Sequence, residues 1–458
     1  MSTEALANGN GEGAKGRRRW FNWHSWTGIV GGLLLFIICW SGSFATISSE
    51  LDWAVNPALR VQPSGQPADM TAIHDSVAMA MPDTEIREVS KPLYANFAAD
   101  VIVSTREGER RHVYVDPYTL EVTGSASYFT LQRFFRDFHM SFYGLLGVGK
   151  YAVTIMAVPL LVSLVSSLVF YKRWWRRFFD LKTGKGGRAL WSSLHKTLGL
   201  WAIWFFVIIV VTSLWYLFEA SRADFIDQKF SYVDVAASAV HPLPNLEGES
   251  GGTLGFAELL ARARQVRPDL DITHVSLDRS GYFYVIGQAD DMLVRDRANK
   301  LFLDPRDGSV AYSQSAEDLS AYWRWSEMAD PLHFGTFGGL ATKLVWFLFG
   351  LIMSALAATG AWLHLKRLHR DAGRTYWTGA TGAAAVSTAV LAYCTVSAVQ
   401  YAVESSGGEG LPFTGVGVPP GVALVAALWS IATLGVAILW LWSLRRVSKQ
   451  NVIPARPA

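Results

Sequence analysis

Five histidines lie at or inside the ends of long apolar segments, where an ionisable side chain is costly and usually faces the interior of a helix bundle. Four of them recur in matched settings, because each is followed by a glycine at the same spacing as its counterpart. The recurring residues are His24 with Gly28 and Ser41-Gly42, His195 with Gly199 and Thr212-Ser213, His139 with Gly144, and His333 with Gly338. The fifth, His364, aligns with Phe170 and is not supported by the repeat.

Two pairs of imidazoles at two depths are what two six-coordinate haem irons require, since each iron takes one axial ligand from each of two facing helices. The glycines lie about one helical turn from each histidine, where a missing side chain lets a flat macrocycle approach the backbone. We therefore predict two b-type haems, one bound by His24 and His195 and the other by His139 and His333. His364 lies at the depth of the first pair and is an alternative to either of its members.

Other interpretations of the histidines account for less of the pattern. A single histidine would indicate an interfacial side chain that reaches the headgroups, but four recur in depth-matched pairs. Zinc or copper would require more donors at one depth than two imidazoles. A c-type haem is excluded because no Cys-x-x-Cys-His motif occurs. The two cysteines, Cys39 and Cys394, lie within apolar segments and support neither a disulfide framework nor a thiolate metal site.

The elements that must position these residues are membrane helices. The 458 residues are 51% hydrophobic and include 19 Trp, which is too apolar for a soluble protein of this length. Segments of about 20 apolar residues can cross the hydrocarbon core. The predicted transmembrane helices are 20–48, 138–172, 194–218, 329–365, 378–401 and 420–443. The first is expected to be an uncleaved anchor, because it is long for a signal peptide and rich in tryptophan. Residues 1–19 are expected to form a disordered cytoplasmic tail.

Basic residues cluster at 17–19, 172–188, 366–374 and 445–449, and all four clusters fall on one side if the helices alternate. By the positive-inside rule this side is the cytoplasm, which places both termini and the loop 173–193 there. The polar segments 49–137 and 219–328 are then periplasmic. Each contains alternating strand-like stretches and an Asp-Pro turn, so we predict two α+β domains that arose by internal duplication.

Basic side chains near the helix ends are candidate partners for the anionic propionates of haem. They are Arg18, Arg19 and Lys196 on the cytoplasmic side, and Arg133, Arg136 and Arg324 on the periplasmic side. Each is explained equally well as a residue of the positive-inside bias or of the protein surface. Trp323 and Trp325 are candidates for stacking on a substrate or on haem.

Several motifs occur together in a fixed order along residues 17–370. They are His24-x3-Gly28, Val113-Tyr-Val-Asp-Pro-Tyr-Thr-Leu-Glu-Val-Thr-Gly124, His139-x4-Gly144, His195-Lys-Thr-Leu-Gly199, and Leu332-His333 with Gly335 and Gly338. In this layout the chain resembles the PepSY-associated transmembrane (PepSY_TM, PiuB-like) proteins of bacterial inner membranes, whose soluble domains are PepSY domains. Its FoxB-like members are di-haem reductases of ferric siderophores. The resemblance implies that His139 and His333 hold the periplasmic haem and that His24 and His195 hold the cytoplasmic one. The helices 378–401 and 420–443 are additional to the four-helix core of this family.

The leading hypothesis is an inner-membrane di-haem b oxidoreductase that takes electrons from an unidentified cytoplasmic or membrane donor. It would reduce a periplasmic ferric siderophore or other ferric chelate and release Fe(II). Apart from membrane lipid, no further partner is indicated, and nucleic acid is not expected. One alternative is a haem-dependent reductase of another acceptor: a quinone, a flavin, copper or a protein. Another is a non-redox periplasmic module that binds or regulates a peptidase. A transporter is disfavoured, because the predicted helices 20–48, 194–218, 378–401 and 420–443 have essentially no Asp, Glu or Lys in their middles.

Overall fold

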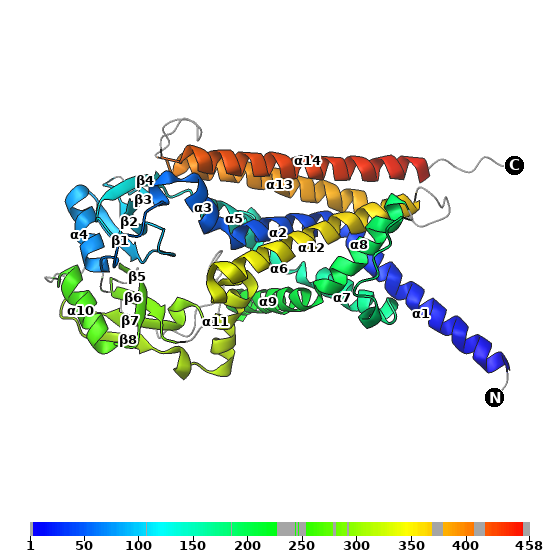
Figure 1. Ribbon diagram of the computed structural model, residues 1–458, viewed down its shortest axis with the longest axis horizontal. Coiled ribbons are helices and arrows are strands. Elements are labelled where there is room, and N and C mark those ends of the chain that lie inside the picture. Colours follow the sequence, from blue (N-terminus) through cyan, green and yellow to red (C-terminus); the bar gives the residue numbers. More distant parts are fainter. Residues whose placement is uncertain are drawn as a thin grey trace.

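The computed structural model describes residues 3–106, 108–184, 186–226, 253–277, 281–290, 293–368, 379–406 and 417–451, together with Leu243 and Leu246. Its helices form an elongated bundle, and an antiparallel sheet lies at one end of that bundle (Figure 1). The first helix starts and the last helix stops at the opposite end. The molecule therefore has a sheet end and an end at which α1 begins and α14 ends, called here the terminal end.

The helices of the bundle vary widely in length. They are α1 (Thr3–Val30), α2 (Gly32–Thr46), α3 (Ser48–Val55), α5 (Leu131–Ser141), α6 (Gly149–Thr154), α7 (Ala157–Phe170), α8 (Gly187–Trp201), α9 (Ile203–Ser221), α11 (Ala321–Phe334), α12 (Gly339–Leu368), α13 (Gly379–Glu404) and α14 (Pro420–Asn451). Among them, α2 and α12 pack side by side along the middle of the bundle.

Within the described residues, five helical segments are long and apolar enough to cross a membrane. They are Gly149–Phe170, Ile203–Ile226, Thr336–Leu368, Gly379–Glu404 and Pro420–Val447. The pair α1 and α2, which is bent by 66° at Gly31, is apolar enough when taken together, and the described residues contain six crossings if this pair counts as one span. The chain is thus a multi-pass membrane protein, as the apolar segments predict.

The N-terminal segment differs from the sequence-based expectation. Residues 1–19 are predicted to be disordered, but α1 already begins at Thr3. Once a helical turn exists, each further residue adds one hydrogen bond at little cost, so a membrane helix can extend well beyond its apolar part.

The histidine-bearing helices are separate from the membrane spans that the sequence predicts to contain them. His139 lies in α5 and His333 in α11, and a tight turn separates each of these helices from the span that follows. The turns begin where Phe142 and Gly335 adopt the left-handed conformation, with φ of 48° and 69°. Such a residue satisfies the last carbonyls of a helix and redirects the chain. Likewise His195 lies in α8, which is separated from α9 at Ala202.

Within the described residues, eight strands form one antiparallel sheet in the order β4-β3-β2-β1-β5-β6-β7-β8. The strands are β1 (Glu85–Ser90), β2 (Ala99–Ser104), β3 (Arg110–Val115), β4 (Val122–Ser127), β5 (Asp271–Leu277), β6 (Phe283–Gln288), β7 (Asn299–Leu303) and β8 (Val310–Gln314). Helix α4 (Met70–Ala80) precedes the first four strands and α10 (Phe256–Val266) precedes the last four. The duplication of the two polar segments is therefore visible in the order of their elements.

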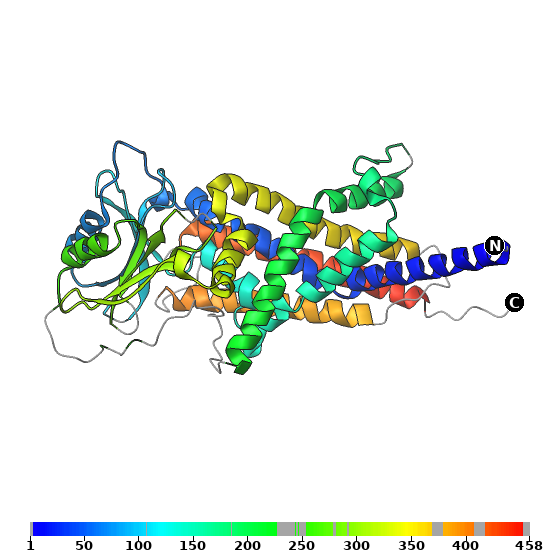
Figure 2. The same cartoon turned by 90° about the horizontal axis from the view of Figure 1, so that it is seen from below.

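The two copies do not form two separate domains, which corrects the sequence-based expectation. Strand β1 pairs with β5, so that Val89 lies opposite Val275 and the two halves make one continuous sheet. An edge strand carries unpaired main-chain groups, and pairing between the copies satisfies them. Helices α4 and α10 cover the face of the sheet that points away from the bundle (Figure 2). The soluble part is thus a single α+β unit at the sheet end.

Candidate functional site

The four recurring histidines meet in two pairs. The ring centroids of His24 and His195 are 6.4 Å apart, and those of His139 and His333 are 6.1 Å apart. Two imidazoles that bind one metal from opposite sides, each at about 2.0 Å, would have centroids separated by about 6.3 Å. The spacing of both pairs therefore fits a single metal atom between the two rings.

Hydrogen bonds to main-chain carbonyl oxygens fix the tautomer of His24 and of His139. The Nδ1 atom of His24 lies 3.0 Å from the carbonyl oxygen of Ser163, and Nδ1 of His139 lies 3.0 Å from that of Ile38. A carbonyl oxygen only accepts hydrogen bonds, so both Nδ1 atoms donate. Each Nε2 then keeps its lone pair, which is the form of imidazole that binds a metal.

The same tautomer follows for His195 and His333 from two threonines. Nδ1 of His195 lies 2.9 Å from Oγ1 of Thr359, and Nδ1 of His333 lies 2.8 Å from Oγ1 of Thr212. Each threonine hydroxyl donates its one hydrogen to a main-chain carbonyl a turn earlier in its own helix, at 2.7 and 2.8 Å. The hydroxyl oxygen must therefore accept from the imidazole, and all four Nε2 atoms are left for a ligand.

A cavity of about 510 Å³ adjoins the His24–His195 pair. Gly28 and Gly199 both line it, and a methyl group added to Gly28 would meet no atom within 4 Å. The cavity wall is largely apolar and comes mainly from α1, α7, α8 and α12. His364 also lines this cavity, although the ring pairing here joins His24 to His195.

A second cavity, of about 340 Å³, adjoins the His139–His333 pair. The glycine that makes room here is Gly42 on α2, because a Cβ at this position would come within 2.6 Å of Cε1 of His139. Gly144 and Gly338 lie in the turns after α5 and α11 and are not among the residues that line the cavity. Ser41-Gly42 and Thr212-Ser213 recur in the sequence, and Ser41, Gly42 and Thr212 contact the histidines of this second pair.

The two cavities share a wall one side chain thick. Leu35, Cys39, Leu160 and Met353 line both of them. Two successive residues of α9 face different cavities, since Phe206 lines the first cavity and Phe205 lines the second. The two histidine pairs are therefore stacked along the bundle with only apolar side chains and one thiol between their cavities.

Cations line both cavities, and the structure changes the predicted set. Lys196, Arg188 and Arg367 line the first cavity, and Arg136, Lys150, Arg295 and Arg297 line the second. Of the predicted partners, Lys196 and Arg136 are in these sets, whereas Arg18, Arg19, Arg133 and Arg324 are not. Arg295 and Arg297 come from the loop between β6 and β7, far from any span, so nothing in the apolar pattern indicated them.

The arginines of the loop between β6 and β7, called here the sheet loop, join the sheet to α11, the helix that carries His333. Nε of Arg295 and Nε of Arg297 each lie 3.1 Å from Oε2 of Glu327, whose side chain is fully buried in α11. Nη1 of Arg295 also lies 3.5 Å from Asp330, which accepts a 2.8 Å hydrogen bond from the hydroxyl of Tyr216. Burial alone would raise the pKa of Asp330, but the charges of Arg295 and Arg136 outweigh it and lower the pKa to about 2. Asp330 is thus a carboxylate.

The predicted aromatic residues lie outside both cavities. Trp323 packs on Tyr322, and Trp325 packs on Trp215, with centroid distances of 4.9 and 6.1 Å. Neither lines a cavity, so the described contacts give these tryptophans a packing role in the helices of the sheet end.

The residues present fit a bis-histidine haem at each position. Both cavities fall in the range of about 300–1,000 Å³ typical of cofactor sites, and both are mostly apolar with a few cations. Each has two imidazoles at the spacing of a shared metal, with Nε2 available. Within the described residues, no group of three or more His, Cys, Asp or Glu side chains gathers to hold a metal ion, so the donor set does not suit zinc.

A comparison with protein families identifies the chain. The model of the PepSY-associated TM region matches residues 21–367, and the chain therefore belongs to this family. The match ends at the close of α12, so that α13 and α14 lie outside it. A comparison with curated proteins found no match.

Proposed function

We propose that this member of the PepSY-associated TM family is an inner-membrane di-haem b oxidoreductase that moves electrons from the cytoplasm to the periplasm. Its acceptor would be a ferric siderophore or another ferric chelate, which leaves as Fe(II). The observation that carries the proposal is the pair of stacked cavities, each with two imidazoles whose Nε2 atoms are available and whose ring centroids lie 6.4 or 6.1 Å apart.

A haem held by two imidazoles supplies a reversible one-electron couple, whose potential depends on its ligands, hydrogen bonds and burial. The chain's own residues prepare for it in three ways. The Nδ1 partners fix the orientation and tautomer of each imidazole. The apolar walls exclude water, and the cations offer pairing to anionic groups.

The shared wall supports transfer along the bundle in two short steps. A bilayer core is roughly 30 Å thick, which is too far for a single site to serve both faces. The residues that line both cavities, Leu35, Cys39, Leu160 and Met353, belong to α2, α7 and α12 and place the two sites one side chain apart.

The distribution of basic residues supports the orientation. The basic residues at 17–19 lie within α1, those at 172–177 follow α7, and those at 366–367 and 445–446 lie toward the ends of α12 and α14. These segments are at the terminal end, away from the sheet (Figure 1). Residues 369–374 of the cluster at 366–374 lie outside the described residues. If this end is cytoplasmic, the sheet is periplasmic and the His139–His333 cavity, which the sheet loop touches, is the electron exit.

A ferric chelate suits such an exit as substrate. One electron converts Fe(III) to Fe(II), and the hard oxygen donors of the chelate hold the larger, less charged ion more weakly. The electron must come from a donor on the cytoplasmic side or in the membrane, and the chain does not identify it.

The first test is the haem content of the purified protein. Absorption spectra and pyridine haemochromogen quantitation should give about two b haems per chain, both low-spin. His24→Ala and His139→Ala should each remove about one haem and abolish ferric-chelate reduction. His364→Ala changes a third histidine of the first cavity and should retain both haems; loss of one haem in this variant would mean that His364 replaces His24 or His195 as a ligand. Colourless protein from haem-replete cells would overturn the proposal.

The acceptor is tested next with the haem-loaded protein. The dithionite-reduced form should be re-oxidised by ferric chelates in a stoichiometric reaction that yields Fe(II). Re-oxidation by a quinone, a flavin, Cu(II) or a protein, with ferric chelates inert, would keep the oxidoreductase and replace its substrate.

A further inference from the structure

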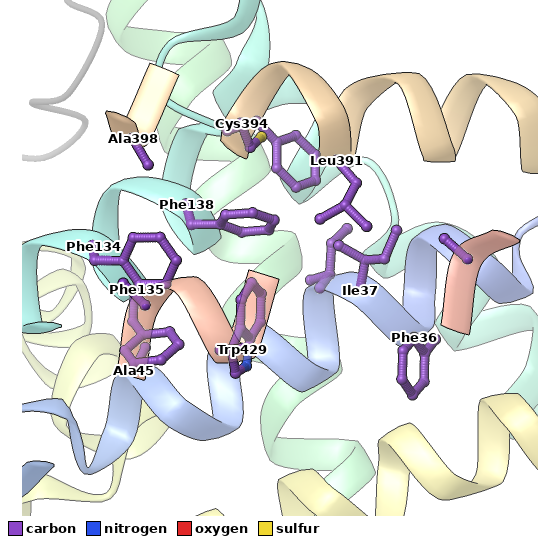
Figure 3. Packing of buried hydrophobic residues seen from close by; sticks show 14 of the residues in the cluster. Phe36, Ile37, Ala45, Phe134, Phe135, Phe138, Leu391, Cys394, Ala398 and Trp429 are labelled. Carbon is purple, nitrogen blue, oxygen red and sulfur yellow. The ribbon is translucent and has the colours of Figure 1, made fainter. Parts of the chain in front are cut away.

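Helices α13 and α14 lie outside the family match, yet they pack into the core of the bundle. The side chain of Trp429 on α14 is only 5% exposed. Its indole meets the rings of three phenylalanines of α5 edge-on: Phe134, Phe135 and Phe138, at centroid distances of 5.7, 5.4 and 5.1 Å. Figure 3 shows Trp429 among these rings. The phenylalanines are themselves fully buried.

The contacted helix is the one that carries His139. Phe135 precedes His139 by one helical turn, so the two side chains project from the same side of α5, and Phe138 is its immediate neighbour. Phe135 also packs on Phe44 of α2, with centroids 5.4 Å apart. Phe44 lies two residues after Gly42, against which the imidazole of His139 rests. A shift of α5 would therefore move His139 relative to α2 and His333.

Helix α5 has eleven residues and a tight turn at its end, so it depends on its neighbours for a fixed position. Its start is held by Asp52, whose carboxylate accepts hydrogen bonds from the main-chain nitrogens of Leu131 and Gln132 at 2.7 and 2.8 Å. This contact fixes one end only. Trp429 is in contact with the helix over the turn that leads to His139.

The equivalent helix in the second repeat is held differently. In α11, which carries His333, Glu327 and Asp330 form ion pairs with the sheet loop. In α5 the residues three and four positions before His139 are Arg136 and Phe135, and the contact there is aromatic. The two copies have thus diverged. Aromatic contacts with α14 support α5 in the first repeat, and ion pairs with the sheet loop support α11 in the second.

Helix α14 is itself anchored to α2. Nε1 of Trp40 donates a 3.1 Å hydrogen bond to Oγ1 of Thr433, and the ring of Trp440 lies close to Gly32, where an added Cβ would meet it at 3.1 Å. Thr433 is one turn from Trp429, so the position of Trp429 along α2 is set on the same face of α14.

We propose that Trp429 is a positioning residue: through α5 it holds His139 opposite His333, and the α13–α14 hairpin serves the ligand geometry of the second cavity. The proposal rests on the proposed function. It predicts that Trp429 affects one histidine pair and not the other, since its ring contacts are with α5 and α2, whereas the hydrogen-bond partners of His24 and His195 belong to α7 and α12.

The test uses the full chain with Trp429→Ala, and with Trp429→Leu as a second variant that keeps much of the apolar volume. Haem content should fall by about half, or the His139–His333 haem should become high-spin in electron paramagnetic resonance spectra, while the other haem stays low-spin. Trp429→Phe should restore the wild-type spectrum. Trp442→Ala, on the same helix but 56% exposed, is the matched control and should change nothing.

Two low-spin haems with unchanged midpoint potentials in Trp429→Ala and Trp429→Leu would overturn the inference. Equal loss of both haems would also overturn it, because the hairpin would then support the bundle as a whole. If the wild-type protein holds no haem, the proposed function fails by itself. The positioning role is then decided by amide hydrogen exchange of residues 131–141, which should speed up in Trp429→Ala and not in Trp442→Ala.

Discussion

His139 rests directly on Gly42: a Cβ at position 42 would come within 2.6 Å of Cε1 and 3.0 Å of Nδ1 of the imidazole. The Nδ1 atom of the ring also donates its hydrogen bond to the same helix, at the carbonyl oxygen of Ile38. Helix α2 therefore helps to position the imidazole of a histidine that belongs to α5. The glycine matters here through the volume it leaves free.

We expect Gly42→Ala to displace His139 from its partner. Overpacking of this kind typically costs about 1–3 kcal/mol. Because the imidazole ring is rigid, it can move away from the added methyl group only if α5 shifts. Haem bound at the second cavity should be lost or become high-spin, while that at the first is retained. Gly435→Ala is the control, since an added methyl on this helical glycine meets nothing within 4 Å. An unchanged spectrum for Gly42→Ala would contradict the close packing described above.

Thr212 and Thr359 are expected to tune cofactor affinity through the histidines that they hold. Valine at either position keeps the shape but removes the acceptor of the Nδ1 hydrogen bond. Losing such a partner typically weakens metal affinity about 10–100-fold. Haem titration of the two variants should show this loss at one cavity each.

Two controls separate this effect from general damage to the bundle. Thr212→Ser retains the hydroxyl and should bind haem as the wild type does. Thr388→Val removes a part-buried hydroxyl that donates to the carbonyl of Ala384 in its own helix, and should leave both affinities unchanged. Equal affinities in the valine and serine variants at position 212 would mean that the hydrogen bond does not orient the ring.

Arg136 is expected to pair with an anionic group in the second cavity. Among the described residues it forms no hydrogen bond or ion pair, and its guanidinium lies 5.4 Å from the ring centre of Phe334. Arg136→Gln removes a positive charge that favours the reduced state of a nearby redox centre. The midpoint potential of the second haem should therefore fall by roughly 40 mV, which corresponds to about 1 kcal/mol for one electron.

A redox titration followed by absorption checks this prediction. Arg133→Gln is the matched control, because Arg133 lies on the same helix but stacks on Tyr128, 3.9 Å from the ring centre. A potential that rises, or that shifts equally in both variants, would argue against an anion at Arg136.

The duplication in the sequence predicted which histidines meet. His24 lies beside His195, and His139 beside His333, as the matched glycines and depths indicate. Equivalent positions of two copies are related by the symmetry of the fold, so a repeat carries three-dimensional information without any long-range contact being known. That these pairs ligate haem stays a prediction.

Other features depend on contacts between distant segments, and the sequence did not predict them. The helix break after His139 has left-handed backbone at Phe142, Tyr143 and Gly144, and only the glycine is a residue type that favours this conformation. The pairing of β1 with β5 joins the two copies, so neither copy alone indicates it. Arg297 and Trp429 lie far along the chain from the histidines that they support. Helical periodicity describes a segment and its own faces, not the partner that covers them.

The ion pair of His112 with Asp100 should make the sheet more stable in mild acid. Burial disfavours the charged imidazole, but the adjacent carboxylate of Asp100, 2.9 Å from Nδ1, outweighs this and raises the pKa of His112. The imidazolium is therefore favoured in the folded state, and its contribution is fully present below the unfolded pKa of about 6.5. It is lost as the pH rises through the raised pKa of the folded protein. The midpoint of thermal unfolding should fall as the pH is raised above about 6.5, and Asp100→Asn should flatten this dependence.

His74→Gln is the control and should leave this pH dependence unchanged, because His74 pairs with Asp75 at the exposed surface. A midpoint that rises over the same interval would show that the imidazole is neutral in the folded protein.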